Sequence, residues 1–161
     1  MKRLILWAAV WAAAVAVAPQ AQAQQTASGT FNVNITLTSV CTLSAIGDVN
    51  FTYTSLQAGV SNATGGAYTV SCTNNLPYTF GLQAGTGALT PPFSPTISVS
   101  DNFVNLSYQL GTSAAGGTGN GAAQAYSITG TMAAGQGGTC GAASCNNGSA
   151  TNRTHTLVVQ Y

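Results

Sequence analysis

Residues 30–38 read Thr-Phe-Asn-Val-Asn-Ile-Thr-Leu-Thr, and this stretch decides the fold class. Every second residue is apolar, and each residue between is polar. Because successive side chains of a β-strand point to opposite faces, this alternation predicts a strand with one buried and one wet face. The apolar face comprises Phe31, Val33, Ile35 and Leu37. Alternation alone does not say whether the strand completes the sheet of its own chain or that of another copy.

The same strand signal recurs along the rest of the chain. Short runs rich in β-branched and aromatic residues are separated by Gly, Pro and Asn turn signals. No sustained helical period follows the N-terminal apolar segment, so the pattern predicts an all-β sandwich or barrel. Two glycine-rich stretches, 111–121 and 135–148, are expected to be connecting loops. The further predicted strands are 49–53, 67–72, 78–83, 96–99, 104–110, 124–129 and 154–161.

The first residues have the pattern of an export signal. Lys2 and Arg3 precede the apolar stretch 4–18, and the small-residue site Ala21-Gln22-Ala23 follows. These are the parts of a secretory signal peptide, which we predict over residues 1–23. An apolar run of about 15 residues is shorter than the roughly 20 that span a bilayer, which disfavours a retained membrane anchor. The remainder of the chain has room for one domain.

Charged side chains are scarce. The 161 residues include three Lys or Arg and two Asp, so charged residues make up 3% of the chain, whereas about a quarter is usual. Lys2 and Arg3 lie within the predicted signal peptide. The rest therefore has no basic patch with which to bind nucleic acid. Little charge repulsion opposes association between copies, and we expect a protein that works by assembling.

All four cysteines follow the predicted signal peptide. An even number of cysteines in an exported chain predicts two disulfides, and four cysteines allow three pairings. Proximity in sequence favours Cys140–Cys145, which leaves Cys41–Cys72 as the second pair. A zinc site is the alternative, but the spacings lack the paired C-x2-C units of zinc ligands. We therefore expect neither a metal nor a cofactor.

Side chains suited to catalysis are few. Asp48, Asp101 and His155 are the only candidates for general acid–base chemistry after the predicted signal, and His155 lies within a predicted strand. No G-x-S-x-G nucleophile motif occurs. We therefore expect the protein not to be an enzyme, and the scarcity of titratable groups disfavours a small secreted hydrolase.

Five segments along the chain share the pattern of one known family. They are 31–42, where the alternating stretch leads into Cys41, and 70–85, 106–110, 126–136 and 156–161. In this order they resemble segments of the archaic, Csu-type chaperone–usher pilins, also classified as the spore coat protein U domain family. The chain departs from the usual family pattern at Thr131 and Ala133, where members carry Arg and Pro, and in its Cys140 and Cys145 pair.

The resemblance implies an immunoglobulin-like β-sandwich over residues 39–161 that lacks its last strand. Residues 24–38 of another subunit would supply it by donor-strand exchange, with Phe31, Val33, Ile35 and Leu37 filling the groove. The implied function is a structural subunit of a secreted pilus that supports adhesion and biofilm formation. The implied partners are copies of the chain or sister pilins, a periplasmic pilus chaperone and an outer-membrane usher, with export to the periplasm and then the cell surface. The alternative is a stand-alone or minor tip-associated binding module that recognises a surface or a glycan.

Overall fold

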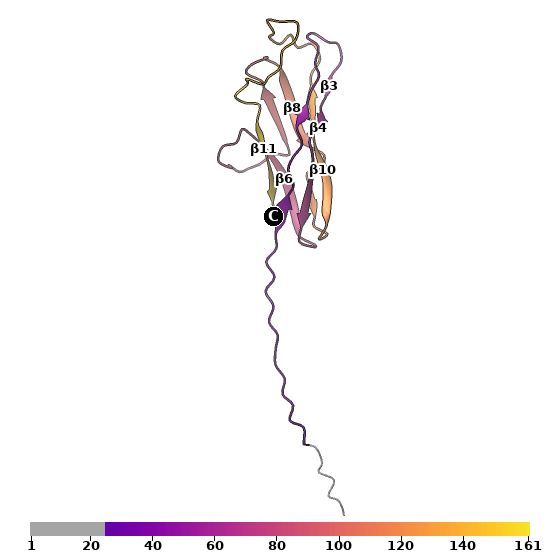
Figure 1. The fold of residues 1–161 in the computed structure, drawn as a ribbon, viewed down its shortest axis with the longest axis vertical. Coiled ribbons are helices and arrows are strands. Elements are labelled where there is room, and N and C mark those ends of the chain that lie inside the picture. The colour runs from indigo at the N-terminus through magenta and orange to yellow at the C-terminus, as the bar shows by residue number, and fades with distance from the viewer. Residues whose placement is uncertain (1–24) are drawn as a thin grey trace, which may run out of the picture. The chain divides into compact units, whose positions relative to one another are not determined.

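The computed structural model describes residues 25–161, and every regular element in that range is a β-strand (Figure 1). The predicted signal peptide, residues 1–23, lies outside the described residues. Within the described part of the chain, no helix is long and apolar enough to cross a membrane. The all-β prediction is therefore confirmed.

The larger sheet has the strand order β1-β5-β10-β8-β7, and all its pairs are antiparallel. A short additional strand, β3, pairs with the end of β10. The strands of this sheet are β1 (Cys41–Leu43), β3 (Ser61–Asn62), β5 (Ala67–Cys72), β7 (Thr96–Ser100), β8 (Ser107–Thr112) and β10 (Ala123–Met132).

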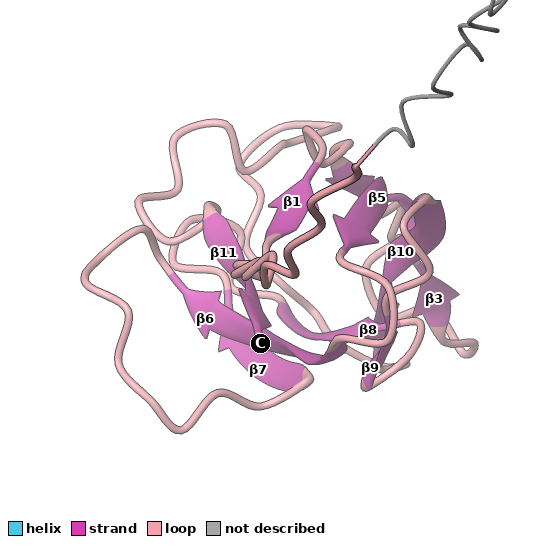
Figure 2. Cartoon of the chain, turned by 90° about the horizontal axis from the view of Figure 1, so that it is seen from below, coloured by secondary structure: helices cyan, strands magenta, loops and turns pink. Residues whose placement is uncertain are grey.

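The smaller sheet has the order β11-β6-β9 and is also antiparallel. Figure 2 shows β6 and β11 side by side, apart from β5 and β10. The smaller sheet comprises β6 (Pro77–Ala84), β9 (Gly116–Thr118) and β11 (His155–Gln160), and a separate short pair joins β2 (Val49–Asn50) to β4 (Thr64–Gly65).

Both sheets contribute side chains to one core. In β5, Tyr68, Val70 and Cys72 are buried while the residues between them are not, as period-two alternation predicts. Phe80 of the smaller sheet packs against Tyr126 of the larger, with ring centroids 4.8 Å apart. Two sheets that share a core between their inner faces form a β-sandwich. The buried core residues are Tyr68, Val70, Cys72, Tyr78, Phe80, Leu82, Leu110, Ile128 and Leu157.

Most predicted strands are present, with changed ends. The prediction for 67–72 agrees with β5, whereas 49–53 shortens to the two residues of β2. The prediction for 104–110 begins too early, because Asp101 holds the backbone of residues 103 and 104 in a turn before β8. β9 was missed, since it lies in the glycine-rich stretch 111–121, where side chains carry no alternation.

The glycines of β9 allow it to pack tightly against β6. A Cβ at Gly116 would collide with the carbonyl oxygen of Tyr78, and a Cβ at Gly117 would overlap the Tyr78 hydroxyl. The glycine-rich stretch is thus partly a strand whose backbone approaches its neighbour more closely than a side chain would allow.

The alternating stretch 30–38 forms no strand in the isolated chain. A strand needs the backbone hydrogen bonds of a neighbour, and a sequence pattern does not supply one. The side chains of Phe31, Val33, Ile35 and Leu37 are between 71% and 85% exposed. These residues therefore form no strand within the sheets of their own chain, and their use by another copy stays a prediction.

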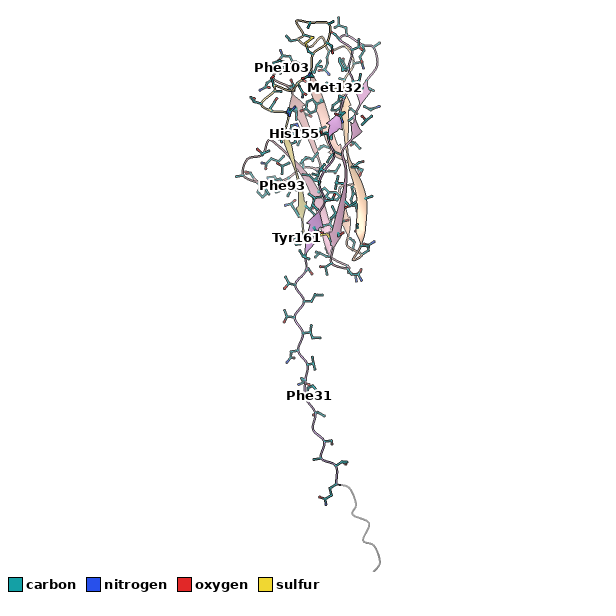
Figure 3. All side chains as sticks on the ribbon, viewed as in Figure 1. Phe31, Phe93, Phe103, Met132, His155 and Tyr161 are labelled. Atoms are coloured by element: carbon teal, nitrogen blue, oxygen red, sulfur yellow. A yellow bond between two sulfur atoms is a disulfide. The ribbon has the colours of Figure 1, made fainter. Side chains whose placement is uncertain are left out.

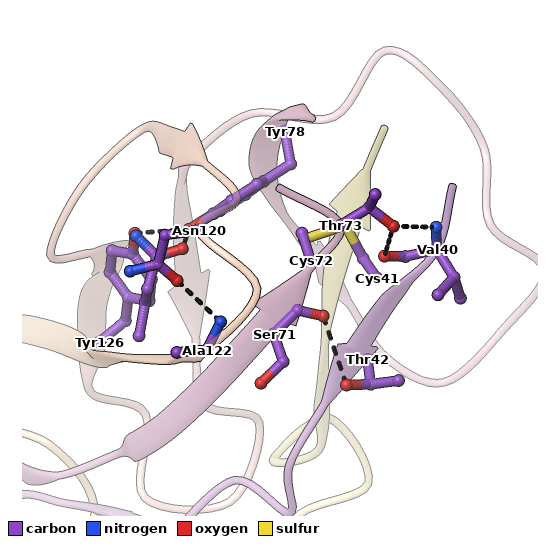
Figure 4. The surroundings of a disulfide bond; sticks show 11 residues. Val40, Cys41, Thr42, Ser71, Cys72, Thr73, Tyr78, Asn120, Ala122 and Tyr126 are labelled. Atoms are coloured by element: carbon purple, nitrogen blue, oxygen red, sulfur yellow. Dashed lines mark hydrogen bonds between the residues drawn. A yellow bond between two sulfur atoms is a disulfide. The ribbon is translucent and has the colours of Figure 1, made fainter. Parts of the chain in front are cut away.

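Both expected disulfides are present. Cys41 and Cys72 are bonded and lie directly opposite each other in the β1–β5 pair. The second bond joins Cys140 to Cys145, five residues later in the β10–β11 loop. Figure 4 shows the first bond. Beside it, the hydroxyl of Thr73 accepts a hydrogen bond from the N–H of Val40 and donates one to the carbonyl oxygen of Val40. Because all four cysteines are in disulfides, they do not form the alternative zinc site.

We expect removal of the Cys41–Cys72 bond to destabilise the domain more than removal of Cys140–Cys145. The longer loop restricts the unfolded chain more, so the double Cys→Ser variants should lose about 3 to 4 and about 2 kcal/mol, respectively. Urea unfolding of the purified chain under non-reducing conditions measures both losses. Equal losses would contradict this account of the two bonds.

Candidate functional site at the open edge of β11

The C-terminal strand β11 has a sheet partner on one side only. It pairs antiparallel with β6 along its whole length, from His155 opposite Ala84 to Gln160 opposite Thr79. No strand among residues 25–161 pairs with its other side. Such an edge presents unpaired backbone donors and acceptors, which are a template for pairing with a further strand.

The direction of the backbone groups follows from the bonds around β6. The N–H groups of Phe80 and Leu82 donate away from β11, to the carbonyl oxygens of Ala115 and Ser94. Because directions alternate along an antiparallel strand, Thr79, Gly81 and Gln83 face β11 and bond to alternate residues of it. The backbone groups at the open edge of β11 are consequently those of His155, Leu157 and Val159.

A groove of about 640 Å³ lies beside this edge. Residues 46–51 and Tyr53 line one part of it, and His155, Thr156 and Leu157 line another. Four of its lining residues are members of the hydrophobic core, namely Leu82, Leu110, Ile128 and Leu157, so the groove reaches the interior of the sandwich. Its other apolar lining residues include Val104, Leu106, Tyr108 and Met132.

One end of the groove is polar. The hydroxyl of Tyr108 lies 2.8 Å from Nε2 of His155, and Asp101 lines the same groove. Nδ1 of His155 is buried and has no hydrogen-bond partner among the described residues. Burial lowers the pKa of His155, and burial together with the charge of Asp101 raises the pKa of Tyr108. His155 is therefore neutral at neutral pH.

Asp101 organises the loops at this end. Its side chain is 2% exposed, yet its Oδ1 accepts hydrogen bonds from the backbone N–H groups of Phe103 and Val104 at 2.9 and 2.8 Å. Its Oδ2 accepts a third bond, from Nδ2 of Asn147 at 2.9 Å. Burial alone would raise the pKa of this carboxyl, but the three bonds stabilise the charged form and lower the pKa overall. Asp101 thereby joins the β7–β8 turn to the β10–β11 loop.

The three candidate acid–base residues have different surroundings. All three line the same groove, but Asp48 is exposed, Asp101 is buried, and His155 is bonded to Tyr108. Hydrogen bonds from the protein occupy both oxygens of Asp101, so this carboxylate serves the structure. Among residues 25–161, no group of three or more His, Cys, Asp and Glu side chains is arranged to hold a metal ion.

The open edge was not foreseen in the sequence pattern, although the strand that carries it was. Residues 154–161 show the alternation of a half-buried strand, and Leu157 and Val159 do face the core. Alternation reports which face is buried and carries no information on how many neighbours the strand has. The family resemblance implied a missing last strand, and the pairing of β11 with β6 alone shows which edge is open.

We expect the stability supplied by Asp101 to be lost in acid. Because the folded-state pKa lies below the ordinary value of 3.8, the contribution is present above that value and falls away as the pH drops through the folded pKa. Asp101→Asn should destabilise the domain by about 1 to 3 kcal/mol at pH 7, since the amide leaves a buried donor unpaired. Melting temperatures from pH 7 to pH 2 should converge for Asp101→Asn and the wild type. Asp48→Asn, at an exposed carboxylate, is the matched control. A difference from the wild-type melting temperature that disappears in acid for Asp48→Asn but not for Asp101→Asn would contradict the role given to Asp101.

Comparisons with known proteins identify a family. Comparison with curated proteins and with solved structures finds no match for the chain. The sequence model of the Spore Coat Protein U domain matches residues 27–158, which include every strand of the sandwich except the last two residues of β11. The chain belongs to the Spore Coat Protein U domain family, a structural family associated with pilus and fimbrial subunits.

Proposed function

We propose that the chain is a structural subunit of a secreted pilus that polymerises by donor-strand complementation. One observation carries the proposal: the open edge of β11 borders a groove that reaches the hydrophobic core. A strand added there forms backbone bonds with β11 and buries its apolar side chains in the groove, which is recognition by β-strand addition. Membership of a family associated with pilus subunits supports the same reading.

The donor that fits this groove is residues 30–38 of another copy. Its apolar face consists of Phe31, Val33, Ile35 and Leu37, which are exposed in the isolated chain. Burying four such side chains is worth about 6 to 12 kcal/mol before ordering costs. The period of two in the donor matches the period of β11, so alternate donor residues face the core while their backbone groups bond to the edge.

The positions of the ends of the sandwich favour one direction for the donor. Cys41, where β1 begins, lies opposite Cys72, and the short turn after Cys72 leads into β6, whose start pairs with the end of β11. The chain therefore enters its sandwich at the end where β11 finishes. A donor parallel to β11 would place the next domain at this occupied end, whereas an antiparallel donor places it at the other. The donor accordingly runs antiparallel to β11, and the copies form a head-to-tail fibre.

This contact does not close on itself. Each copy has its own donor at one end, and the donor that fills its groove connects to the next domain at the other end. A growing chain of copies therefore always retains one free groove and one free donor. Heterologous contacts that do not close produce filaments. The filament at the cell surface would support adhesion and biofilm formation.

An unoccupied groove also implies assembly partners. It exposes core side chains and unpaired strand edge, a combination that favours aggregation. A periplasmic chaperone that lends a strand to β11 would protect the subunit after export, and an outer-membrane usher would exchange this strand for the donor of the next copy.

Ile35→Asp should abolish fibre formation, because a carboxylate would be buried in the apolar groove. Asn34→Asp is the matched control, since it adds the same charge one residue earlier on the opposite face of the donor. Negative-stain microscopy and size-exclusion chromatography of the exported protein measure assembly. We expect fibres from the wild type and Asn34→Asp only.

Two outcomes would overturn the proposal. Fibres formed by Ile35→Asp at the normal rate would exclude residues 30–38 as the donor. A wild-type chain that folds and stays monomeric without a chaperone would favour the stand-alone binding module instead.

Val159→Pro should weaken strand addition without disrupting the β6–β11 pair. The N–H of Val159 faces the open edge, and proline lacks this donor while being tolerated on strand edges. We expect the affinity of a synthetic peptide of residues 25–39 to fall by about tenfold, the loss of roughly 1.4 kcal/mol expected for one hydrogen bond. Titration calorimetry measures the affinity, and an unchanged value in a folded variant would place the peptide elsewhere.

A further inference from the structure

An imidazole lies on the wall of the groove that the proposed donor would cover. His155 shares the inward face of β11 with Leu157 and Val159, and its ring lines the groove beside Tyr108. Figure 3 shows His155 near the start of β11 and Tyr161 just beyond its end. Because the backbone of His155 also faces the open edge, a strand that pairs along this edge lies over the imidazole.

This imidazole is the side chain of the groove that titrates near neutral pH. The chain contains one histidine. Carboxyl, guanidinium and phenol groups have ordinary pKa values outside the range from about pH 5 to pH 8, whereas the pKa of histidine lies within it. A change in the charge of the groove over this range therefore belongs to His155. The other titratable side chains that line the groove are Asp48, Tyr53, Asp101, Tyr108 and Arg153.

The proposed donor brings no titratable side chain into the groove. Residues 25–39 contain only Gln, Thr, Ala, Ser, Gly, Phe, Asn, Val, Ile and Leu. The donor therefore supplies no countercharge to a protonated imidazole. A peptide of this segment with blocked ends is uncharged, so any dependence of its binding on pH arises in the groove.

The surroundings of the ring favour its neutral form. Nε2 of His155 lies 2.8 Å from the hydroxyl of Tyr108, whereas Nδ1 is buried and has no partner among residues 25–161. In the charged ring both nitrogens carry a proton, and the proton on Nδ1 would find no acceptor in the described part of the chain. Burial lowers the pKa of His155 already in the isolated chain, where the residue is still partly exposed to water.

Neighbouring charges do not compensate for this burial. Asp101 is buried, but its two oxygens accept three hydrogen bonds from the loops. Asp48 and Arg153 have opposite charges and are both exposed, so water screens them and their effects on the ring oppose each other. Neither nitrogen of His155 bonds to any of these three groups.

We propose that uptake of a donor strand is coupled to the protonation of His155, so that the groove accepts the donor when the imidazole is neutral and resists it when the imidazole is charged. A covering strand removes the remaining water from the ring, which penalises only the charged form. Protonation therefore weakens donor binding, and donor binding lowers the pKa of His155 by the same factor. Assembly is favoured at neutral pH and opposed in acid. This step rests on the proposed function, since it takes residues 30–38 as the occupant of the groove.

The single histidine makes the coupling directly measurable. NMR titration follows the ring protons of His155 in the exported chain carrying Ile35→Asn, which blocks the chain's own donor without adding a titratable group. Addition of a peptide of residues 25–39 with blocked ends should lower the pKa of His155 by at least about 1.

The affinity of the same peptide gives the second measurement. By calorimetry, the affinity should fall about five- to tenfold from pH 7.5 to pH 4.5, while circular dichroism checks that the fold is intact at both values. His155→Phe keeps an apolar ring that cannot be protonated, so its affinity should change less than about twofold over this range. Asp48→Asn is the matched control, because it removes a carboxylate from the same groove and should keep the pH dependence.

The outcomes separate the coupling from donor binding itself. A pKa of His155 that the bound peptide leaves unchanged would overturn the coupling, as would a pH dependence that persists in folded His155→Phe. If His155→Phe does not fold, the NMR titration of the unsubstituted ring decides alone. Absence of peptide binding at pH 7.5 would instead overturn the proposed function.

Discussion

The unpaired edge of β11 is the constraint on which the rest of the structure depends. His155, Leu157 and Val159 direct backbone N–H and C=O groups away from β6, and no described residue bonds to them. In an immunoglobulin-like sandwich one more strand would occupy this place. Because the adjoining groove opens into the core, the absence of this strand leaves core side chains uncovered and lowers the stability of the whole domain. In the account proposed here, folding is completed by association, and the fibre is its product.

The scarcity of charge takes on a defined meaning in this setting. A surface of Gly, Ser, Thr, Asn and Gln does not repel other copies, but it does not select a partner either. Selection comes from the match between an apolar face of period two and a groove beside an open strand. The one buried carboxylate, Asp101, is used to fasten two loops together at the far end of the groove. A chain with so few ionisable groups thus places its buried charge at one end of the groove.

Local patterns in the sequence were sufficient for the fold class and for most strands, since alternation in stretches such as 67–72 reports burial directly. Proximity along the chain was sufficient for the two disulfides. The missed features are those that depend on distant partners. β9 consists of Gly-Gly-Thr and exists because β6 lies against it, while 30–38 has a clear strand pattern and no neighbour. The approach of His155 to Tyr108, and the joining of Asp101 to Asn147, likewise require residues about 46 positions apart to meet.

Hydrogen exchange at β11 tests the central claim most directly. In the isolated chain, the amides of Thr156, Val158 and Gln160 bond to β6 and should be protected, whereas those of His155, Leu157 and Val159 should exchange quickly. Addition of a peptide of residues 25–39 should slow exchange at these three amides strongly, and the same peptide carrying Ile35→Asp should not. If the peptide binds while these amides continue to exchange as before, the added strand is not at the open edge of β11, and the account fails.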